Sequence, residues 1–306
     1  MTTVISGVAG FIGSNLARRI NSLSDHDVIG IDRMTQGKVR NLHDVRLADF
    51  IDYDDDVCIE KLLRSLKPGD LFLHQGACTD TMEFDGQKMM ALNYEKSRRW
   101  HQICMEQRLR FIYASSAAVY GHGPSFVPGN ERPLNIYGFS KLAFDQFILR
   151  QPQQFQTVGL RYFNVYGLGE EHKGSMASCA FGFAEQARLT GEIKLFEGSD
   201  KFLRDFIHVD DVVAVVMHFI QTPHISGVFN CGTGEARSFL ELACEVQKHR
   251  QSKITEIKMP KELEANYQKL TKSDNMMLIA SGFKQEFMSL EQGIDIYMKQ
   301  LEGSCL

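Results

Sequence analysis

Near the amino terminus stands Gly7-Val8-Ala9-Gly10-Phe11-Ile12-Gly13, the run that decides the fold of this 306-residue chain. It follows a short β-rich run at residues 2–6 and opens a segment, residues 11–23, with helical periodicity. Glycines permit a tight turn and let the backbone approach a pyrophosphate, which the helix dipole then stabilises. The spacing is GxxGxxG, which departs from the commoner GxGxxG pattern of dinucleotide sites. The run predicts a strand, a phosphate-binding turn and a helix.

Strand and helix patterns alternate through the first half of the chain. Further strands are predicted at residues 28–32, 71–75, 110–115 and 156–162. Helical patterns lie between them, at residues 57–66, 86–107 and 135–150. Such alternation is typical of parallel βαβ units in an open sheet that helices cover on both faces. The predicted fold class is therefore α/β, a Rossmann-type doubly wound parallel sheet with a smaller, mainly helical substrate domain.

The pattern loosens after about residue 165. A polar loop at residues 167–174 precedes a predicted helix at 176–190. Residues 206–220 are expected to return to the sheet, 228–230 to add a strand, and the last 70 residues to be mainly helical and polar. We therefore expect a nucleotide-binding domain of residues 1–167, completed by about 206–232. The expected substrate-binding domain comprises residues 168–205 and 233–306.

Composition excludes several classes of protein. The net charge of −4 gives no reason to expect nucleic acid or an anionic membrane as partner. The longest apolar run, residues 212–220, is too short to cross a bilayer, and no basic region precedes the apolar amino terminus. The seven cysteines are odd in number and never spaced as CxxC, which favours free thiols and gives no metal site. We expect a cytoplasmic enzyme without a metal.

Three charged residues bear on the cofactor. Asp32 ends the second predicted strand, 19 residues after Gly13, where a carboxylate can bind the hydroxyls of an adenine ribose. Asp32 would repel a ribose 2′-phosphate, whereas Arg33 and Lys38 can neutralise it. Two cations against one anion favour NADP, with NAD as the alternative.

Tyr137 and Lys141 stand four residues apart at the start of a predicted helix. That spacing stacks both side chains on one helix face, about one turn apart. A free phenol titrates near pH ~10, but a neighbouring ammonium favours phenolate. This is what an enzyme needs in order to remove an alcohol proton during hydride transfer.

Ser116 follows the predicted strand that ends near Tyr113. A hydroxyl at the carboxyl end of a parallel strand points into the ligand crevice of such folds. There Ser116 can hydrogen-bond a substrate oxygen and share its proton with Tyr137. Alanines at positions 117 and 118 follow it directly.

Together the glycine run, Asp32, Ser116 and the Tyr137–Lys141 pair resemble the extended short-chain dehydrogenase/reductase superfamily over most of the first 165 residues. Longer runs are similar to the family of ADP-L-glycero-D-manno-heptose 6-epimerases and extend the match across nearly the whole chain. These runs are QGACT at residues 75–79, RYFNVYG at 161–167, HKGSMAS at 172–178 and FEGS at 196–199.

The resemblance implies an enzyme that inverts the sixth carbon of ADP-D-glycero-D-manno-heptose. The carbon is oxidised to a flat ketone by NADP and reduced again from the opposite face, so net redox is zero. The implied catalytic residues are Tyr137, Lys173 and Ser116, with acid–base groups on both sides of the carbon. Lys141 is implied to hold the nicotinamide ribose and to lower the pKa of Tyr137. The implied setting is the inner-core heptose of lipopolysaccharide, and the implied assembly is a homo-oligomer, a pentamer in family members.

The same resemblance gives two sets of binding residues. Those expected at the cofactor are Gly7, Gly10, Phe11, Ile12, Gly13, Asp32, Arg33, Lys38, Gln75, Gly76, Ala77, Cys78, Thr79, Asn93, Lys141, Val165 and Lys173. Those expected at the substrate are Asn164, Ser175, Phe196, Glu197, Gly198, Ser199, Arg204 and Tyr267. Arg204 suits a diphosphate, because a guanidinium can hold phosphate oxygens bidentately.

Two positions depart from the family pattern. Some family members carry a histidine substrate contact where Gly182 stands and a lysine near the cofactor where Tyr53 stands. The second change removes a cation that would favour NADP.

Two other functions stay open at this point. A UDP-hexose 4-epimerase shares the predicted fold, although it does not predict the Lys173 loop. A non-catalytic dinucleotide-binding sensor also shares it, although such proteins often lose the tyrosine or lysine that this chain retains. A 4,6-dehydratase is disfavoured, because by resemblance it carries acidic residues where Ala117 and Ala118 stand.

Overall fold

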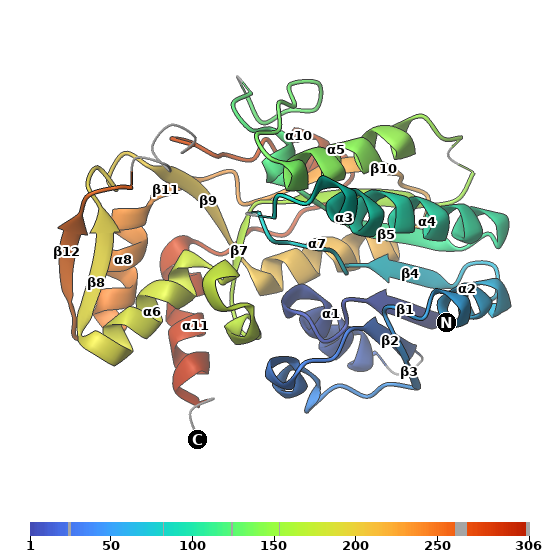
Figure 1. Ribbon diagram of the computed structural model, residues 1–306, viewed down its shortest axis with the longest axis horizontal. Coiled ribbons are helices and arrows are strands. Elements are labelled where there is room, and N and C mark those ends of the chain that lie inside the picture. The colour runs from blue at the N-terminus through green and yellow to red at the C-terminus, as the bar shows by residue number, and fades with distance from the viewer. Residues whose placement is uncertain (24–25, 82, 124, 153, 261–267, 304–306) are drawn as a thin grey trace.

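The computed structural model describes residues 1–23, 26–81, 83–123, 125–152, 154–260 and 268–303. Its centre is a seven-stranded sheet in which every paired neighbour is parallel (Figure 1). In spatial order the strands are β10 (Gly227–Cys231), β6 (Thr157–Tyr162), β5 (Arg110–Ser116), β4 (Leu71–His74), β1 (Thr2–Ser6), β2 (Asp27–Asp32) and β3 (Asp49–Asp52). The predicted fold class is confirmed.

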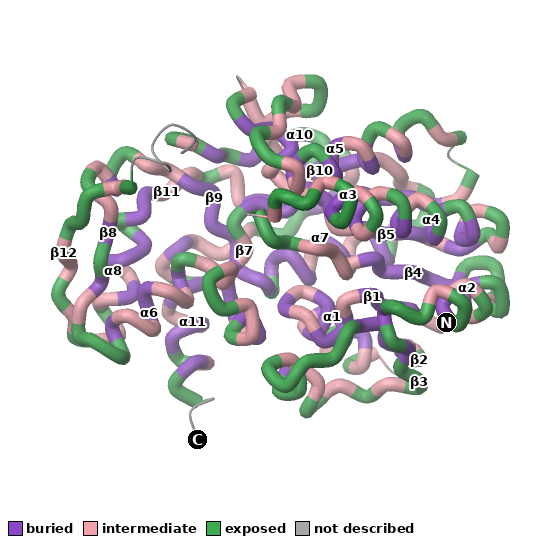
Figure 2. The backbone as a smooth tube through the Cα atoms, in the orientation of Figure 1, coloured by how far each residue is buried: buried purple, intermediate pink, exposed green. Residues whose placement is uncertain are grey.

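Helices cover both faces of this sheet. One face carries α1 (Phe11–Asn21) and α7 (Val209–Gln221), and the other carries α2 (Asp56–Ser65), α4 (Lys96–Glu106) and α5 (Ile136–Leu149). Successive strand residues serve opposite faces: Val4 packs into the second layer and Ile5 into the first. Because both layers exclude water, strands β1 and β4 are almost wholly buried, and Figure 2 shows this in purple.

The helical stretch predicted at residues 86–107 is divided into three segments. It comprises α3 (Gly86–Met90), a π-helical turn (Ala91–Glu95) and α4. Short 3₁₀ segments lie at Gln36–Leu42, Ala117–Val119 and Glu171–Met176.

The smaller part of the molecule lies beyond the carboxyl ends of the central strands and combines helices with two small sheets (Figure 1). The parallel pair is β8 (Glu192–Phe196) and β12 (Lys253–Ile257). The three-stranded sheet is β11 (Ala236–Ser238), β9 (Leu203–His208) and β7 (Asn164–Tyr166). Its helices are α6 (Cys179–Thr190), α8 (Phe239–His249) and α11 (Leu290–Gly303), while α10 (Met276–Ala280) packs near β10. A separate apolar core that includes Phe183, Leu242 and Ile294 holds this part together.

Several of these elements differ from the sequence expectation. Residues 206–220 were expected to return to the sheet. They instead finish β9 in the three-stranded sheet and then form α7, which covers the central sheet. The patterns also missed β3, β8 and β12, which are short and lie at sheet edges, where alternation is weak. In the part of the chain that the structure describes, no helix is long and apolar enough to span a bilayer.

Candidate active site

The glycine run forms a tight turn between β1 and α1. Gly7 adopts φ +74°, and a Cβ there would lie 2.7 Å from the amide nitrogen of Gly76. A Cβ on Gly13 would lie 2.0 Å from the Gly7 carbonyl oxygen. Gly10 is the N-cap of α1 and provides no side-chain cap, so the first N–H groups of the helix are available to an anion. The turn therefore has the shape and polarity that fit a pyrophosphate.

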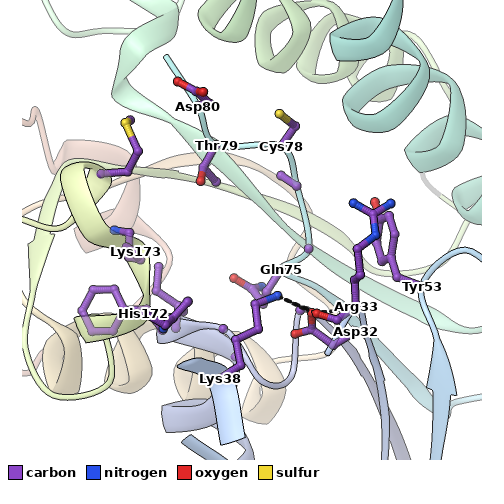
Figure 3. Close-up of a pocket in the computed structure, with 18 of the residues that line it drawn as sticks. Asp32, Arg33, Lys38, Tyr53, Gln75, Cys78, Thr79, Asp80, His172 and Lys173 are labelled. Carbon is purple, nitrogen blue, oxygen red and sulfur yellow. Dashed lines mark hydrogen bonds and ion pairs between the residues drawn. The ribbon is translucent and has the colours of Figure 1, made fainter. Parts of the chain in front are cut away.

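A cavity of about 480 Å³ opens over this turn, at the carboxyl ends of β1, β2 and β4. Figure 3 shows Arg33 and Tyr53 at one end of the cavity and His172 and Lys173 at the other. The cofactor candidates that line it are Gly7, Gly10, Phe11, Ile12, Gly13, Asp32, Arg33, Lys38, Gln75, Gly76, Ala77, Cys78, Thr79 and Lys173. Sequence reasoning did not propose His172 and Met176, which come from the same loop as Lys173 and also line the cavity.

Asp32 is buried and already holds three donors. Its Oδ2 accepts the Ala9 N–H at 2.8 Å. Its Oδ1 accepts the Arg33 N–H at 2.7 Å and the Lys38 ammonium at 2.6 Å (Figure 3). The carboxylate therefore ties the glycine turn to the end of β2.

Both cations that favoured NADP are paired with carboxylates in this structure. Lys38 pairs with Asp32, and Arg33 makes two bonds of 2.8 and 2.5 Å to Asp54. A 2′-phosphate at this end of the cavity would have to share or replace those partners. The Tyr53 ring lies beside Arg33, whose guanidinium is 5.9 Å from the centre of the ring.

A second cavity, of about 330 Å³, brings the three predicted catalytic residues together. Ser116, Tyr137 and Lys173 line it, as do the cofactor candidates Lys141 and Val165 and the substrate candidate Asn164. It shares with the first cavity the residues Phe11, Ile12, Gln75, Ala77, Thr79, Lys173 and Met176. A ligand in the first cavity can therefore meet one in the second.

Close packing of α5 against the turn after β5 sets Tyr137 beside Ser116. Asn135 caps α5 by accepting the Gly138 N–H at 2.8 Å. A Cβ on Gly138 would lie 2.6 Å from the Ala118 carbonyl oxygen, so only glycine permits this approach. The Lys141 ammonium, one turn later, donates to the Ala114 carbonyl at 2.9 Å.

The pKa values of this pair differ from the sequence expectation. Burial raises the pKa of Tyr137, and a hydrogen bond with Ser116 opposes that rise only in part. Burial lowers the pKa of Lys141 to about 8, against the opposing charge of Asp145. In the protein without a dinucleotide, burial of the phenol therefore determines the net direction of the Tyr137 pKa. The lowering expected from Lys141 together with a cationic nicotinamide ring stays a prediction.

Lys173 is half-buried, whereas a loop lysine is usually solvated. Its ammonium lies 5.3 Å from the centre of the Phe11 ring. Burial lowers the pKa of Lys173, and the negative charge of Glu170 opposes that effect. A lysine with a lowered pKa is neutral, and can accept a proton, at a lower pH than a solvated lysine.

A third cavity, of about 420 Å³, lies in the smaller part of the molecule. Its walls are largely aromatic and aliphatic, and Cys179 lines both this cavity and the second one. The substrate candidates Phe196 and Ser199 line it. Arg204 does not line the cavity, but its guanidinium lies 5.4 Å from the centre of the ring of Phe239, which does. Phe183, Phe202 and Phe239, which also line the cavity, carry no local sequence signal that could have identified them.

Some predicted residues lie elsewhere. Asn93 stands behind the first cavity, accepting the Cys78 N–H at 2.8 Å and donating to the Cys78 carbonyl at 2.9 Å, so it supports the lining. The described residues Ser175, Glu197 and Gly198 do not line these three cavities. A Cβ at Gly182 would have no heavy atom within 4 Å. Tyr267 lies outside the described residues.

Among the described residues, no group of three or more His, Cys, Asp or Glu side chains is placed to hold a metal ion. A strand-end serine, a tyrosine and a lysine beside a glycine-rich turn define a dinucleotide-dependent enzyme of the Rossmann class.

Comparison with known proteins identifies the family of enzymes to which the chain belongs. Residues 3–232 match the NAD dependent epimerase/dehydratase family. The chain is 42% identical to ADP-L-glycero-D-manno-heptose-6-epimerase of Brachyspira hyodysenteriae, over 98% of both chains. It is 43% identical to the protein of that name from Alkalilimnicola ehrlichii, over 96% of both. The crystal structure of the Helicobacter pylori ADP-L-glycero-D-manno-heptose-6-epimerase superposes with a TM-score of 0.87 at 33% identity, covering 98% of this chain and 96% of that one. The chain belongs to the NAD dependent epimerase/dehydratase family, in the branch of these heptose epimerases.

Proposed function

We propose that this protein interconverts ADP-D-glycero-D-manno-heptose and ADP-L-glycero-D-manno-heptose at the sixth carbon. One observation carries the proposal: Ser116, Tyr137 and Lys173 line a cavity that joins the dinucleotide cavity to a third, largely apolar one. Two nucleotides, a cofactor and a nucleotide-linked sugar, can thus approach one set of acid–base groups from two sides. The relatives at 42 and 43% identity support the heptose over a UDP-hexose.

When bound over the glycine turn, in the first cavity, a dinucleotide would supply hydride transfer from the sixth carbon and back to its other face. Ser116 holds the sugar oxygen by a hydrogen bond, next to Tyr137. Tyr137 removes the hydroxyl proton of one epimer. Lys173, which reaches the cavity from a different loop, protonates the oxygen in the inverted configuration. Two groups are needed because inversion changes the direction in which the oxygen points.

We propose the following division of the binding roles. Residues 1–167 with about 206–232 bind the dinucleotide, and residues 168–205 with 233–306 bind the sugar nucleotide. Arg204 and the aromatic walls of the third cavity suit an adenosine diphosphate, since a guanidinium binds phosphate and aromatic rings stack on a base. Ser175, Glu197, Gly198 and Tyr267 keep their expected substrate role as proposals from family resemblance.

The proposed cofactor is NADP, with NAD as the alternative. The support is the pair of cations, Arg33 and Lys38, at the ribose end of the first cavity. The family description names NAD, which is why NAD stays the alternative.

The biological setting is also a proposal. We infer that the product enters lipopolysaccharide inner-core synthesis in the cytoplasm and that the protein is a homo-oligomer, a pentamer by family resemblance. The described cysteines Cys58, Cys78, Cys104, Cys179, Cys231 and Cys244 are free thiols, which suits a reducing compartment.

The proposed function is tested by incubating purified protein with ADP-D-glycero-D-manno-heptose and no added cofactor. We expect the L-glycero epimer to form until the two epimers reach equilibrium, because tightly held dinucleotide is regenerated in each cycle. Absence of that epimer, even with NADP⁺ supplied, would show that the assignment is wrong. Parallel incubation with UDP-glucose tests the 4-epimerase alternative.

A further inference from the structure

The loop that carries Lys173 is anchored at both ends by one buried side chain. Glu170 is fully buried, and its carboxylate accepts four hydrogen bonds. Its Oε1 accepts the Gly167 N–H at 3.2 Å and the Ser178 hydroxyl at 2.8 Å. Its Oε2 accepts the Ser178 N–H at 2.5 Å. The two ends of the segment 167–178 are thereby fixed to the same carboxylate.

The fourth donor comes from a distant element. The Tyr297 hydroxyl of α11 donates to Glu170 Oε1 at 3.1 Å. Glu170 thus connects the loop to the first turn of α6, through Ser178, and to α11. A buried carboxylate that is satisfied in this way holds its neighbours in a defined geometry, because each released donor would remain desolvated.

The loop that carries Lys173 is also fixed to the glycine turn between β1 and α1. The Asn41 side-chain amide donates to the carbonyls of Ala9, at 3.0 Å, and Gly169, at 2.9 Å. Asn15 of α1 donates to the Leu168 carbonyl at 2.9 Å. The Lys173 loop is therefore held by Asn41 at the glycine turn and by Glu170 at the smaller part of the molecule.

We propose that Glu170 is a positioning residue for the reaction: its carboxylate keeps the loop closed so that the Lys173 ammonium faces both cavities. The Lys173 N–H also donates to the Glu170 backbone carbonyl at 2.9 Å, so the two residues are linked through the main chain. The charged or titratable groups that face this carboxylate are Lys173 on its own loop, Cys179 at the start of α6 and Tyr297 on α11. This role rests on the proposed function for its chemical meaning, since Lys173 is the second acid–base group.

The carboxylate also acts on Lys173 through its charge. Glu170 is the negative group that raises the pKa of Lys173 against the effect of burial. Replacement by the isosteric amide removes that charge and weakens the acceptor for the Ser178 and Gly167 donors. The titration of Lys173 then moves to lower pH, and the loop loses its fixed geometry.

The test compares the wild type with Glu170→Gln and with Glu171→Gln, a neighbouring exposed carboxylate on the same loop. Competitive acetylation of Lys173, followed by mass spectrometry across a pH series, measures its titration without any substrate. We expect the midpoint to shift to lower pH in Glu170→Gln only. In the epimerase assay, kcat falls by about 100-fold with bound cofactor retained, the size of loss expected from an ~1 Å displacement of a reacting group. Identical Lys173 titration and identical kcat in the two variants would overturn the proposal.

Two other outcomes of the experiment also test the proposal. If the wild type does not epimerise ADP-heptose, the proposed function fails, whereas the acetylation series still tests the link between Glu170 and Lys173. If Glu170→Gln does not fold, Tyr297→Phe replaces it, because it removes one donor and leaves the charge. For that variant we expect a several-fold loss of kcat with an unchanged KM. An unchanged kcat would overturn the positioning role.

Discussion

The Lys173 ammonium lies 5.3 Å from the centre of the Phe11 ring, over the first residue of the helix that follows the glycine turn. Lys173 thereby lines both the first and the second cavity, and Tyr137 of α5 lines the second one as well. An enzyme that only oxidises an alcohol needs one such group. An epimerase needs another for the inverted oxygen, and we propose that Lys173 is that group.

Replacement of Lys173 by methionine should separate oxidation from inversion. Tyr137 remains, so one epimer should still reduce the bound dinucleotide in a single turnover. Net epimerisation should fall by about 10²- to 10⁴-fold, the usual contribution of a general acid or base. Nicotinamide absorbance and product analysis measure the two steps. The matched control is Lys299→Met, an exposed lysine on α11, and equal activity in both variants would remove Lys173 from the mechanism.

Replacement of Tyr137 by phenylalanine should retain bound dinucleotide and lose most turnover. The phenol makes its hydrogen bond with Ser116, so its loss leaves the α5 backbone and Lys141 in place. We expect kcat to fall by about 10²- to 10⁴-fold. Tyr94→Phe, at a tyrosine that lines none of the three described cavities, serves as control. Turnover at the wild-type rate in Tyr137→Phe would exclude a proton-transfer role.

The ion pair between Arg33 and Asp54 should reduce the preference for NADP. Both side chains are about half exposed, so the pair itself is weak. Asp54→Asn frees the guanidinium and should tighten NADP binding by up to about fivefold while leaving NAD binding unchanged. Calorimetry on protein stripped of cofactor measures both affinities. Asp44→Asn, which breaks the surface pair with Arg18, is the control. An equal change in the affinities for both dinucleotides would contradict a role for Arg33 at the 2′-phosphate.

Buried histidines should make the fold sensitive to acid. His74 bridges the Ser6 and Ser97 hydroxyls at 2.7 Å each, and burial lowers its pKa from 6.5 to about 3. The unfolded chain therefore binds a proton between about pH 6.5 and 3 that the folded chain excludes. The resulting stability is fully present above pH 6.5 and is lost as pH falls through that window.

His74→Asn should flatten this pH dependence. Between pH 6 and 4, the slope of the free energy of unfolding against pH should decrease by about 1.4 kcal/mol per pH unit, the contribution of one proton. Urea unfolding at a series of pH values measures it. The exposed His224 provides the control variant, His224→Asn. A slope in His74→Asn equal to that of the wild type would show that His74 does not exclude the proton.

The part of the site that the sequence could predict is the part encoded by short spacings. The glycine turn and the Tyr137–Lys141 pair each depend on residues within one or two helical turns, so local pattern is sufficient. The aromatic third cavity is different. Phe183 and Phe239 meet there from α6 and α8, and only tertiary packing brings them together. The pairing of Arg33 with Asp54 likewise depends on the edge strand β3, which carried no clear strand pattern.

The pKa values of the site residues were harder to predict than the positions of those residues. Sequence spacing correctly placed Ser116, Tyr137 and Lys141 around one cavity. It did not predict that burial would raise the Tyr137 pKa, because desolvation depends on everything that packs around the phenol. Lys173 was identified by family resemblance, and its half-buried position follows from the Glu170 and Asn41 anchors, which lie outside any local motif.

The central claim is that the hydrogen removed from the sixth carbon is the same one that returns to it, while Tyr137 and Lys173 move only oxygen-bound protons. The most direct test is epimerisation of ADP-D-glycero-D-manno-heptose in deuterium oxide with no added cofactor. The account predicts that the L-glycero product forms with ordinary hydrogen at that carbon. Deuterium incorporated at the sixth carbon would contradict it, because the hydrogen would then have come from solvent.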